Sequence, residues 1–426
     1  MQQEFSLAYA TTADNNDPLQ SFREQFYIPH LNDAHAIYFL GNSLGLQPKT
    51  TQDEVLKIME NWANFGVEGF FMGNNPWMQY HKKLLPSLSK IMGANEHELV
   101  VMNHLTVNLH LLMISFYQPT AKRYKIICEA KAFPSDQYVM QSQIKMHGLK
   151  IEDCLIEVHP REGEETIRHD DIISAIHLHG AETALVLFSG INYYTGQVFN
   201  MKAIAAAARI AGAYVGFDLA HAAGNISLQL HDWDIDFACW CNYKYLNSGP
   251  GSIAGTFIHE KHLSDTSLQR LEGWWGNDES NRFKMEPRFT PSPSAEAWQM
   301  STAPMMQLAT HYASLQIIEA AGFDTMVTKS RALSSYLLFV LNSINENGKY
   351  FTIITPKAAN EHGCQVSISV HQNAKKIFDQ LLPAGIFADW REPNVIRVAP
   401  VPLYNSFKEI FTFAQTLQTI FTNSHV

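Results

Sequence analysis

The chain has 426 residues, of which 46% are hydrophobic and 17% charged, a mixture typical of a globular protein with an ample core. Its net charge of −10 argues against nucleic acids and anionic membranes as partners. No run of residues approaches the ~18 apolar positions of a membrane span, and the first residues lack the pattern of a signal peptide. The cysteines form no metal-spaced pairs. Composition therefore predicts a reduced, cytoplasmic protein.

Short β-rich runs alternate with longer helical runs along the first three quarters of the chain, which predicts βα units and a largely parallel sheet. We expect the following elements in chain order: a helix over 106–117 opened by Thr106, a strand over 124–130, a helix over 135–148 capped by Ser135 or Asp136, a strand over 183–190, an alanine-rich helix over 201–213, strands within 213–224 and 236–244, a helix over 334–344 and a strand over 363–370. In the 236–244 strand, Cys239 and Cys241 should point to one face and pack in the core.

The mixed strands and helices of the last hundred or so residues predict a second, smaller α+β domain. The expected organisation is an N-terminal segment over 1–45 that packs with the small domain, a large domain over 46–310 and a small domain over 311–426.

Unusual residues follow four of the expected strands at the point where each strand ends. They are Phe133-Pro134-Ser135-Asp136, Ser189, Asp218-Leu219-Ala220-His221 and Tyr243-Lys244. In open α/β sheets, ligands bind beyond the carboxyl ends of the strands. The pattern predicts a ligand site at this edge of the sheet.

Lys244 stands between two tyrosines and just before a glycine-rich loop, in the stretch NYKYLNSGPGSIAG (242–255). A lysine in this position is either a surface residue that reaches for water or an amine used for chemistry. An activated amine suggests pyridoxal phosphate, which needs a carboxylate at its ring nitrogen, a flat partner for its ring and N–H donors for its phosphate. Asp218 fits the first need, Phe133 or His221 the second, and the helix start at Leu105-Thr106 the third.

Each of these residues also has a purely structural interpretation. Asp218 could cap the following turn, Phe133 could be a core residue, and His104 and His221 could be interior histidines, which is the interpretation we favour for His104. The glycines of 249–255 could form a plain turn, since they lack the P-loop pattern. The order of the residues along the chain favours the cofactor site.

This order resembles the aspartate-aminotransferase-type (fold type I) pyridoxal-phosphate enzymes, and at finer grain the sequence resembles the kynureninase family. The matching stretches span nearly the whole chain: YFLGNSLGLQPK (38–49), NHLTVNLH (103–110), FPSDQY (133–138), FDLAHAAGN (217–225), NYKYLNSGPGSIAG (242–255), FIHEKH (257–262), GWWG (273–276), RFKMEP (282–287) and NVIRVAPVPLYNSF (394–407). The resemblance implies an α/β architecture with a mostly parallel, seven-stranded type of sheet and a smaller α+β C-terminal domain.

The resemblance also implies roles for particular residues. Lys244 would be the Schiff-base lysine, and Asp218 would pair with the pyridine nitrogen. Phe133 would lie over the ring, and the phosphate would be held at Leu105-Thr106 with the Tyr243 hydroxyl. Asp136, Ser189 and His221 would be further cofactor contacts. Tyr243 would be a second acid–base candidate after Lys244.

Trp274 and Thr302 fall where the family brings cofactor contacts from a second subunit, so a homodimer with shared active sites is implied. Arg397 would bind the substrate α-carboxylate, and Ser43 and Asn277 would lie near the substrate. The implied reaction is hydrolytic Cβ–Cγ cleavage of L-kynurenine or 3-hydroxykynurenine to L-alanine and anthranilate or its hydroxylated analogue. This reaction would serve tryptophan breakdown or pyridine-nucleotide synthesis.

Two questions stay open in the sequence. Gly66-Val67-Glu68-Gly69, Asn277 and Thr302 differ from the pattern of animal relatives that prefer the hydroxylated substrate, so the substrate preference is not decided.

The alternative functions are those of another enzyme of the same fold, a cysteine desulfurase or an aminotransferase, and that of a non-catalytic relative. The residue before Lys244 is a tyrosine where desulfurases usually have histidine, and the only late cysteine, Cys364, is expected to be packed.

Overall fold

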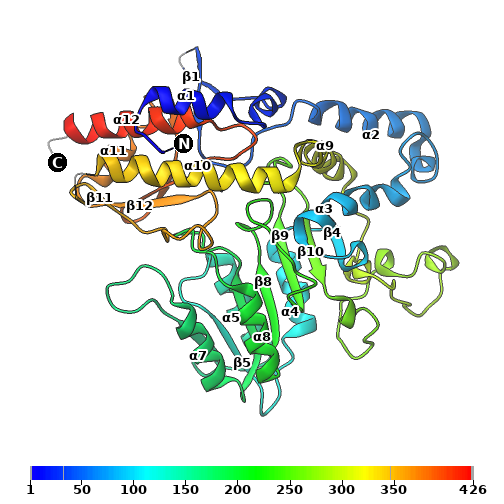
Figure 1. The fold of residues 1–426 in the computed structure, drawn as a ribbon. Coiled ribbons are helices and arrows are strands. Elements are labelled where there is room, and N and C mark those ends of the chain that lie inside the picture. The colour runs from blue at the N-terminus through cyan, green and yellow to red at the C-terminus, as the bar shows by residue number, and fades with distance from the viewer. Residues whose placement is uncertain (1, 32, 346, 424–426) are drawn as a thin grey trace.

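The computed structural model describes residues 2–31, 33–345 and 347–423 (Figure 1). Its main element is a seven-stranded sheet. In spatial order, the strands are β4 (Leu99–Met102), β10 (Ala254–Ile258), β9 (Phe237–Cys241), β8 (Tyr214–Asp218), β7 (Thr183–Ser189), β5 (Lys125–Glu129) and β6 (Leu155–Val158). β10 is antiparallel to both of its neighbours, and the remaining pairs are parallel. The prediction of a mostly parallel sheet of this type is confirmed.

Helices cover both faces of the sheet because successive side chains of each strand point to opposite faces. In β9, Ala238 and Trp240 belong to the core that also contains residues of α7 (His169–His179) and α8 (Met201–Ala211). Cys239 belongs to the core under α4 (Leu105–Phe116) and α5 (Pro134–Met146). Cys239 packs in the core as predicted, whereas Cys241 is buried but lines a cavity. Because both faces of the sheet are covered, every side chain of a central strand such as β9 is buried.

The ends of α8 follow from its sequence. The Asn200 side chain accepts a hydrogen bond from the Ala203 N–H at 3.2 Å, which caps the first turn. The helix ends at Gly212, whose φ of 72° lies in the left-handed region that favours glycine. The alanine-rich helix predicted over 201–213 is therefore confirmed, with slightly shorter bounds.

The predicted cap of α5 is wrong. The helix begins at Pro134, with Phe133 as its N-cap residue, and the Phe133 position makes no side-chain capping bond. Proline suits the first turn because its missing N–H would have no helical partner there. Ser135 and Asp136 therefore lie inside the helix, and both line a cavity instead of capping.

The C-terminal region has its own antiparallel sheet and core (Figure 1). The sheet contains, in order, β11 (Phe351–Ile353), β12 (Val366–Val370), β15 (Val395–Val398) and β14 (Asp389–Arg391). Its helices are α10 (Phe323–Ile344), α11 (Ala374–Phe378) and α12 (Phe407–Asn423). The helix predicted over 334–344 is the second half of α10, whose apolar residues pack on this sheet.

The N-terminal segment lies against the C-terminal region, where α1 (Leu7–Asn15) runs beside α12 in Figure 1. The Asp14 carboxylate accepts hydrogen bonds from the Phe407 N–H at 2.7 Å and the Lys408 N–H at 3.1 Å. A carboxylate at a helix N-terminus is stabilising because the first N–H groups are unpaired and the helix dipole is positive there. β3 (Ile37–Tyr38) also pairs in parallel with β13 (Ile386–Phe387). The exact domain boundaries stay predictions.

The other strands and α-helices are β1 (His30–Leu31), β2 (Ala34–His35), α2 (Thr51–Phe65), α3 (Leu85–Met92), α6 (Ile151–Cys154) and α9 (Met305–Ala321). α9 packs against both α2 and α3.

His311, in α9, is a buried histidine that should make the fold sensitive to acid. Its side chain is fully buried, and neither ring nitrogen has a hydrogen-bond partner among the described residues. Burial lowers its pKa from 6.5 to about 3. The unfolded chain therefore binds a proton at this histidine at a higher pH than the folded chain does. The contribution of neutral His311 to the free energy of unfolding is fully present above pH 6.5 and is lost as the pH falls toward 3.

The variant H311L is expected to remove this dependence. Relative to H311L, the free energy of unfolding of the wild type should fall by about 1.4 kcal/mol per pH unit between these two pKa values. Urea unfolding at several pH values from 7 to 4 measures the difference. The exposed His177 supplies the control, and H177L should follow the wild type. A difference between H311L and the wild type that did not change with pH would contradict the assignment.

Candidate active site

Side chains from the carboxyl ends of β5, β7, β8 and β9 meet at one cavity of about 260 Å³. The candidate residues that line it are Ser43, Leu105, Thr106, Phe133, Asp136, Ser189, Asp218, His221, Tyr243 and Lys244. A larger cavity of about 840 Å³, lined in part by Asn200 and Arg331, contains none of the candidates. The structure thus brings the predicted strand-end residues together at this edge of the sheet, and their role in binding a ligand stays a prediction.

Lys244 follows β9 and its amine is directed into the cavity. Its Nζ lies 3.0 Å from His221 Nε2 and 6.0 Å from the centroid of the Phe133 ring. Burial, and then the charge of Lys244, lower the pKa of His221 well below its usual range. The imidazole is therefore neutral, and its Nε2 can accept a hydrogen bond from the Lys244 amine. The interpretation of Lys244 as a surface residue that reaches for water is wrong.

A glycine in the GNSLG stretch holds the N-terminal segment against the lysine. The Gly45 N–H donates to the Tyr243 carbonyl at 2.8 Å. A Cβ atom at Gly45 would collide with the Lys244 carbonyl oxygen and with Asn247. Only glycine permits this approach, which brings Asn42 and Ser43 to the cavity.

Asp218 and Asp136 form a buried carboxylate pair. Burial raises the pKa of Asp218, while the Ala220 N–H and Lys244 oppose the rise. Burial and then the charge of Asp218 raise the pKa of Asp136 well above its usual range. Two buried carboxyl groups that interact favour one shared proton, carried by Asp136. Asp218 Oδ1 also accepts from the Ala220 N–H at 2.7 Å, so Asp218 caps the turn and faces the cavity as well.

The cavity presents groups that fit pyridoxal phosphate. Asp136 Oδ1, Ser189 Oγ and His221 Nδ1 are buried in its wall without a hydrogen-bond partner among the described residues. Buried polar atoms normally have partners, so these three point to a polar ligand. A protonated ring nitrogen near Asp218 would offset the cost of burying that carboxylate.

The start of α4 supplies the expected anion site. α4 begins at Leu105, and His104 at its N-cap makes no side-chain capping bond. The first N–H groups of a helix have no helical acceptor and lie at the positive end of its dipole. Because Leu105 and Thr106 line the cavity, this helix end can bind a phosphate.

Two structural interpretations of the sequence are wrong. His104 is exposed, and its Nε2 pairs with the Gly251 carbonyl at 3.0 Å, so it is not an interior histidine. Phe133 is 40% exposed and lies at the cavity, so it is not a core residue. Sequence could not separate these cases because a residue at the end of a strand can face either the core or the opening.

Arg397, Trp274, Asn277 and Thr302 do not line the cavity of this chain. Arg397 lies in β15 and is 1% exposed. Trp274 is 47% exposed, and its Nε1 donates to the Arg282 carbonyl at 2.8 Å. Asn277 is buried and its Oδ1 accepts from the Thr290 N–H at 2.8 Å.

Ser135 and Ala220, which belong to the predicted strand-end stretches, also line the cavity. The lining residues that sequence reasoning missed are Asn42, Ile191, Tyr193, Cys241 and Arg391. Most of them are neighbours of predicted residues, and their proximity in the chain could have indicated them. Arg391 carried no such signal, because it comes from the C-terminal sheet and reaches the cavity only through the tertiary fold.

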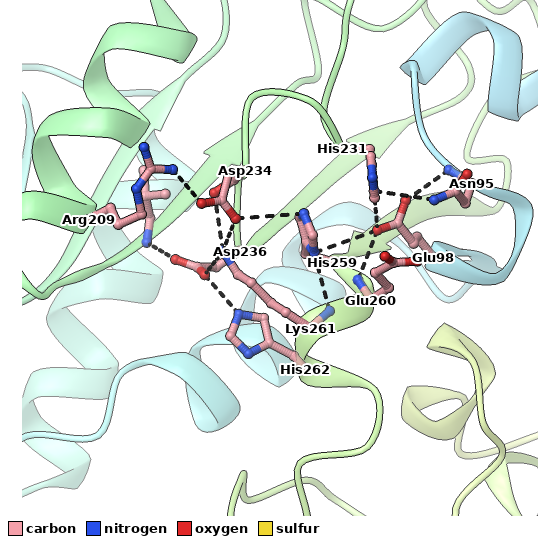
Figure 2. Close-up of polar contacts among 11 residues, drawn as sticks. Asn95, Glu98, Arg209, His231, Asp234, Asp236, His259, Glu260, Lys261 and His262 are labelled. Carbon is pink, nitrogen blue, oxygen red and sulfur yellow. Dashed lines mark hydrogen bonds and ion pairs between the residues drawn. The ribbon is translucent and has the colours of Figure 1, made fainter.

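A second polar cluster lies where β4 and β9 begin and β10 ends (Figure 2). Glu98, which precedes β4 and is fully buried, lies 2.9 Å from His231 Nδ1 and 3.7 Å from His259 Nδ1. It also accepts a hydrogen bond from the Glu260 N–H at 2.8 Å. The two imidazole rings are stacked, with an interplanar angle of 17°. These contacts join the residue before β4 to the residues that follow β10.

Comparisons with known proteins agree with this geometry. The structure superimposes on a C-DES mutant with glycine covalently linked to its pyridoxal-phosphate cofactor, with a TM-score of 0.77 at 18% identity over 93% of this chain and 98% of that chain. It matches a cysteine desulfurase from Thermococcus onnurineus NA1 with a TM-score of 0.77 at 17% identity over 95% and 98%. The fold is that of the fold type I pyridoxal-phosphate enzymes.

Sequence comparison identifies the family. The chain is 52% identical to a kynureninase of Flavobacterium psychrophilum over 97% of both chains, and 49% identical to one of Christiangramia forsetii over 98% and 99%. It is 44% identical to a kynureninase of Mus musculus over 97% and 93%. Residues 326–417 match the family model described as Kynureninase C-terminal domain. The chain belongs to the kynureninase family.

Proposed function

We propose that this chain catalyses the pyridoxal-phosphate-dependent hydrolysis of the Cβ–Cγ bond of L-kynurenine, 3-hydroxykynurenine or both. The products are L-alanine and anthranilate or 3-hydroxyanthranilate. The observation that carries the proposal is the position of Lys244, whose amine points into a cavity with a buried carboxylate, in a chain 52% identical to a kynureninase. The enzyme is a hydrolase of carbon–carbon bonds in ketonic substances.

Several residues of the cavity would hold the cofactor. When bound, pyridoxal phosphate withdraws electron density from the α-carbon of the substrate. Asp218 would keep the ring nitrogen protonated, and Asp136, Ser189 and His221 would bind the polar edge of the cofactor through atoms that lack other partners. Phe133 would cover the ring. Leu105 and Thr106 would bind the phosphate at the start of α4, with the Tyr243 hydroxyl beside them.

The reaction requires groups that hold the substrate and move protons. Arg397 would bind the α-carboxylate, with Ser43 close by. The Lys244 amine would take the proton from the α-carbon, and its hydrogen bond to His221 orients it for that transfer. Water would add to the side-chain ketone, after which the Cβ–Cγ bond breaks. Burial raises the pKa of Tyr243, so its hydroxyl stays protonated and can donate a proton to the developing alanine.

A cysteine desulfurase is disfavoured by the cysteines. All of them are buried, and Cys364, the late cysteine, is 0% exposed and does not line the cavity, so it is not placed to receive sulfur from a substrate there. The test is to incubate the purified protein and pyridoxal phosphate with L-kynurenine and, separately, with 3-hydroxykynurenine. Formation of anthranilate or its hydroxylated analogue supports the proposal and gives the substrate preference. Formation of sulfide from added cysteine, or of glutamate when added 2-oxoglutarate takes the amino group of the substrate, without either aromatic product would refute it.

The active unit is proposed to be a homodimer. Trp274, Phe283 and Phe71 are each about half exposed, and their rings form a continuous surface, with centroids of Trp274 and Phe283 5.5 Å apart and of Phe71 and Phe283 5.7 Å apart. Val67 and Met285 are more than two thirds exposed nearby in sequence. Contiguous exposed apolar residues mark interaction surfaces. A second copy docked on this surface would supply Trp274, Asn277 and Thr302 to the cavity.

Mixing two inactive variants tests whether Trp274 acts on the other subunit. A dimer of one K244A chain and one W274A chain would contain one complete cavity, since the W274A chain keeps Lys244 and receives Trp274 from its neighbour. Co-refolded mixtures are therefore expected to show more anthranilate formation than either parent alone. If Trp274 acted on its own chain, both cavities would be defective and the mixture would show no gain. Light scattering on each parent verifies that both still form dimers.

The proposed reaction would serve tryptophan breakdown or pyridine-nucleotide synthesis. We also propose a cytoplasmic location, which is supported by the free, buried cysteines. Among the helices of the described residues, none has the length and apolar character needed to cross a membrane.

A further inference from the structure

Arg391 is a cavity residue to which no role has yet been given. It ends β14, which pairs antiparallel with β15 so that Asp389 lies opposite Arg397. Arg391 lines the cavity together with Tyr193 and Lys244, whereas Arg397 does not. The side chain of Arg391 is 37% exposed and that of Arg397 is 1% exposed. Arg391 is therefore the guanidinium that an incoming ligand can reach first.

One carboxylate joins the two arginines. Asp389 Oδ2 lies 3.3 Å from Arg391 Nη2, and the same oxygen pairs with Arg397 Nη2. The guanidinium groups therefore lie side by side. Arg397 also donates to the Tyr193 carbonyl, and the guanidinium carbon of Arg391 lies 5.9 Å from the centroid of the Tyr193 ring. The Tyr193 ring in turn meets Phe133 edge-on at 5.2 Å.

The charges of this group are unbalanced. Two guanidinium groups share a single carboxylate, and the Nε atoms of both arginines are buried without a hydrogen-bond partner among the described residues. A second carboxylate would neutralise the excess charge and could take two parallel hydrogen bonds from a planar guanidinium. The substrate of the proposed reaction carries one such group, on its α-carbon.

Building on the proposed function, we propose that Arg391 is a further substrate-binding residue. It forms the cavity-side arm of a two-arginine clamp for the substrate α-carboxylate, with Arg397 behind it. Asp389 is the positioning residue that holds both guanidinium groups in place. The clamp would orient the amino acid so that its amine meets the cofactor beside Lys244.

A pair of ligands that differ only at the carboxylate tests this clamp. L-alanine, the proposed product, and L-alaninamide are titrated separately into the full-length protein loaded with pyridoxal phosphate, and the change in cofactor absorbance gives each affinity. In R391Q, the affinity for L-alanine should fall by about 10- to 100-fold, the size of a lost charge-assisted hydrogen bond. The affinity for L-alaninamide should not change comparably. R391K should lie between the wild type and R391Q because it keeps the charge without the planar fork.

The control is R161Q, which removes an arginine that pairs with Asp171 outside the cavity. It should bind both ligands as the wild type does. Equal losses for both ligands in R391Q, or no loss for L-alanine in both R391Q and R391K, would overturn the clamp. If the wild type releases anthranilate but R391Q and R391K bind L-alanine normally, only the proposed role of Arg391 is refuted. Wild-type protein that releases no aromatic product would refute the proposed function itself.

Discussion

Replacing Lys244 by alanine is expected to lower the turnover number by about 10²- to 10⁴-fold, which is the range for loss of a positioned acid–base group. The variant lacks the Lys244 amine, whose Nζ lies 3.0 Å from His221 Nε2. The α-proton of the substrate would then have no acceptor at that point. Anthranilate formation under saturating substrate measures the loss, and added ethylamine should restore part of it if the missing function is proton transfer.

The matched control for this variant is K202A, which removes an exposed lysine of α8 and should turn over normally. Borohydride treatment of the cofactor-loaded wild type, followed by peptide mapping, should place the label on Lys244. K244A should acquire none. A label on another lysine, or turnover by K244A close to that of the wild type, would show that the amine has no catalytic role.

The variant D218N is expected to lower turnover by about 10²- to 10³-fold, the size of a lost electrostatic partner in a buried site. An asparagine at this position can keep the hydrogen bond that Asp218 Oδ1 accepts from the Ala220 N–H, but it cannot stabilise a positive charge on the cofactor ring. The anthranilate assay measures the effect, and cofactor content measured in parallel should be nearly unchanged.

Stability measurements distinguish a specific loss of turnover in D218N from misfolding of the variant. Because burial raises the pKa of Asp218, its charged form is disfavoured in the fold. The cofactor-free D218N protein should therefore unfold at a urea concentration no lower than the wild type does. The exposed Asp232 supplies the control, and D232N should leave both turnover and unfolding unchanged. A D218N protein that turned over normally would exclude a role for this carboxylate at the ring nitrogen.

Local patterns in the sequence predicted much of the fold. Strands β5, β7, β8 and β9 and helices α4, α5 and α8 were predicted within a few residues because apolar spacing, caps and glycine ends are local signals, as α8 with Asn200 and Gly212 shows. Strands β4, β6 and β10 and helix α7 were not predicted. The cap predicted for α5 was wrong. Asp136 has the right chemistry for a cap, but the direction of its side chain depends on the residues it packs against. The preference of a residue type for the cap position does not show which way its side chain points.

The candidate site, like the fold, could be predicted from the sequence only in part. By itself, the sequence determined that Asp218, His221 and Lys244 sit at the ends of strands in one sheet, because parallel strands bring their carboxyl ends to a common edge. Only the tertiary structure decided that Gly45 carries the N-terminal segment to the lysine and that Arg391 reaches the same cavity from the C-terminal sheet. These contacts join residues far apart in the chain. They depend on how separate elements dock, and that docking is set by the packing of whole surfaces rather than by any short stretch of sequence.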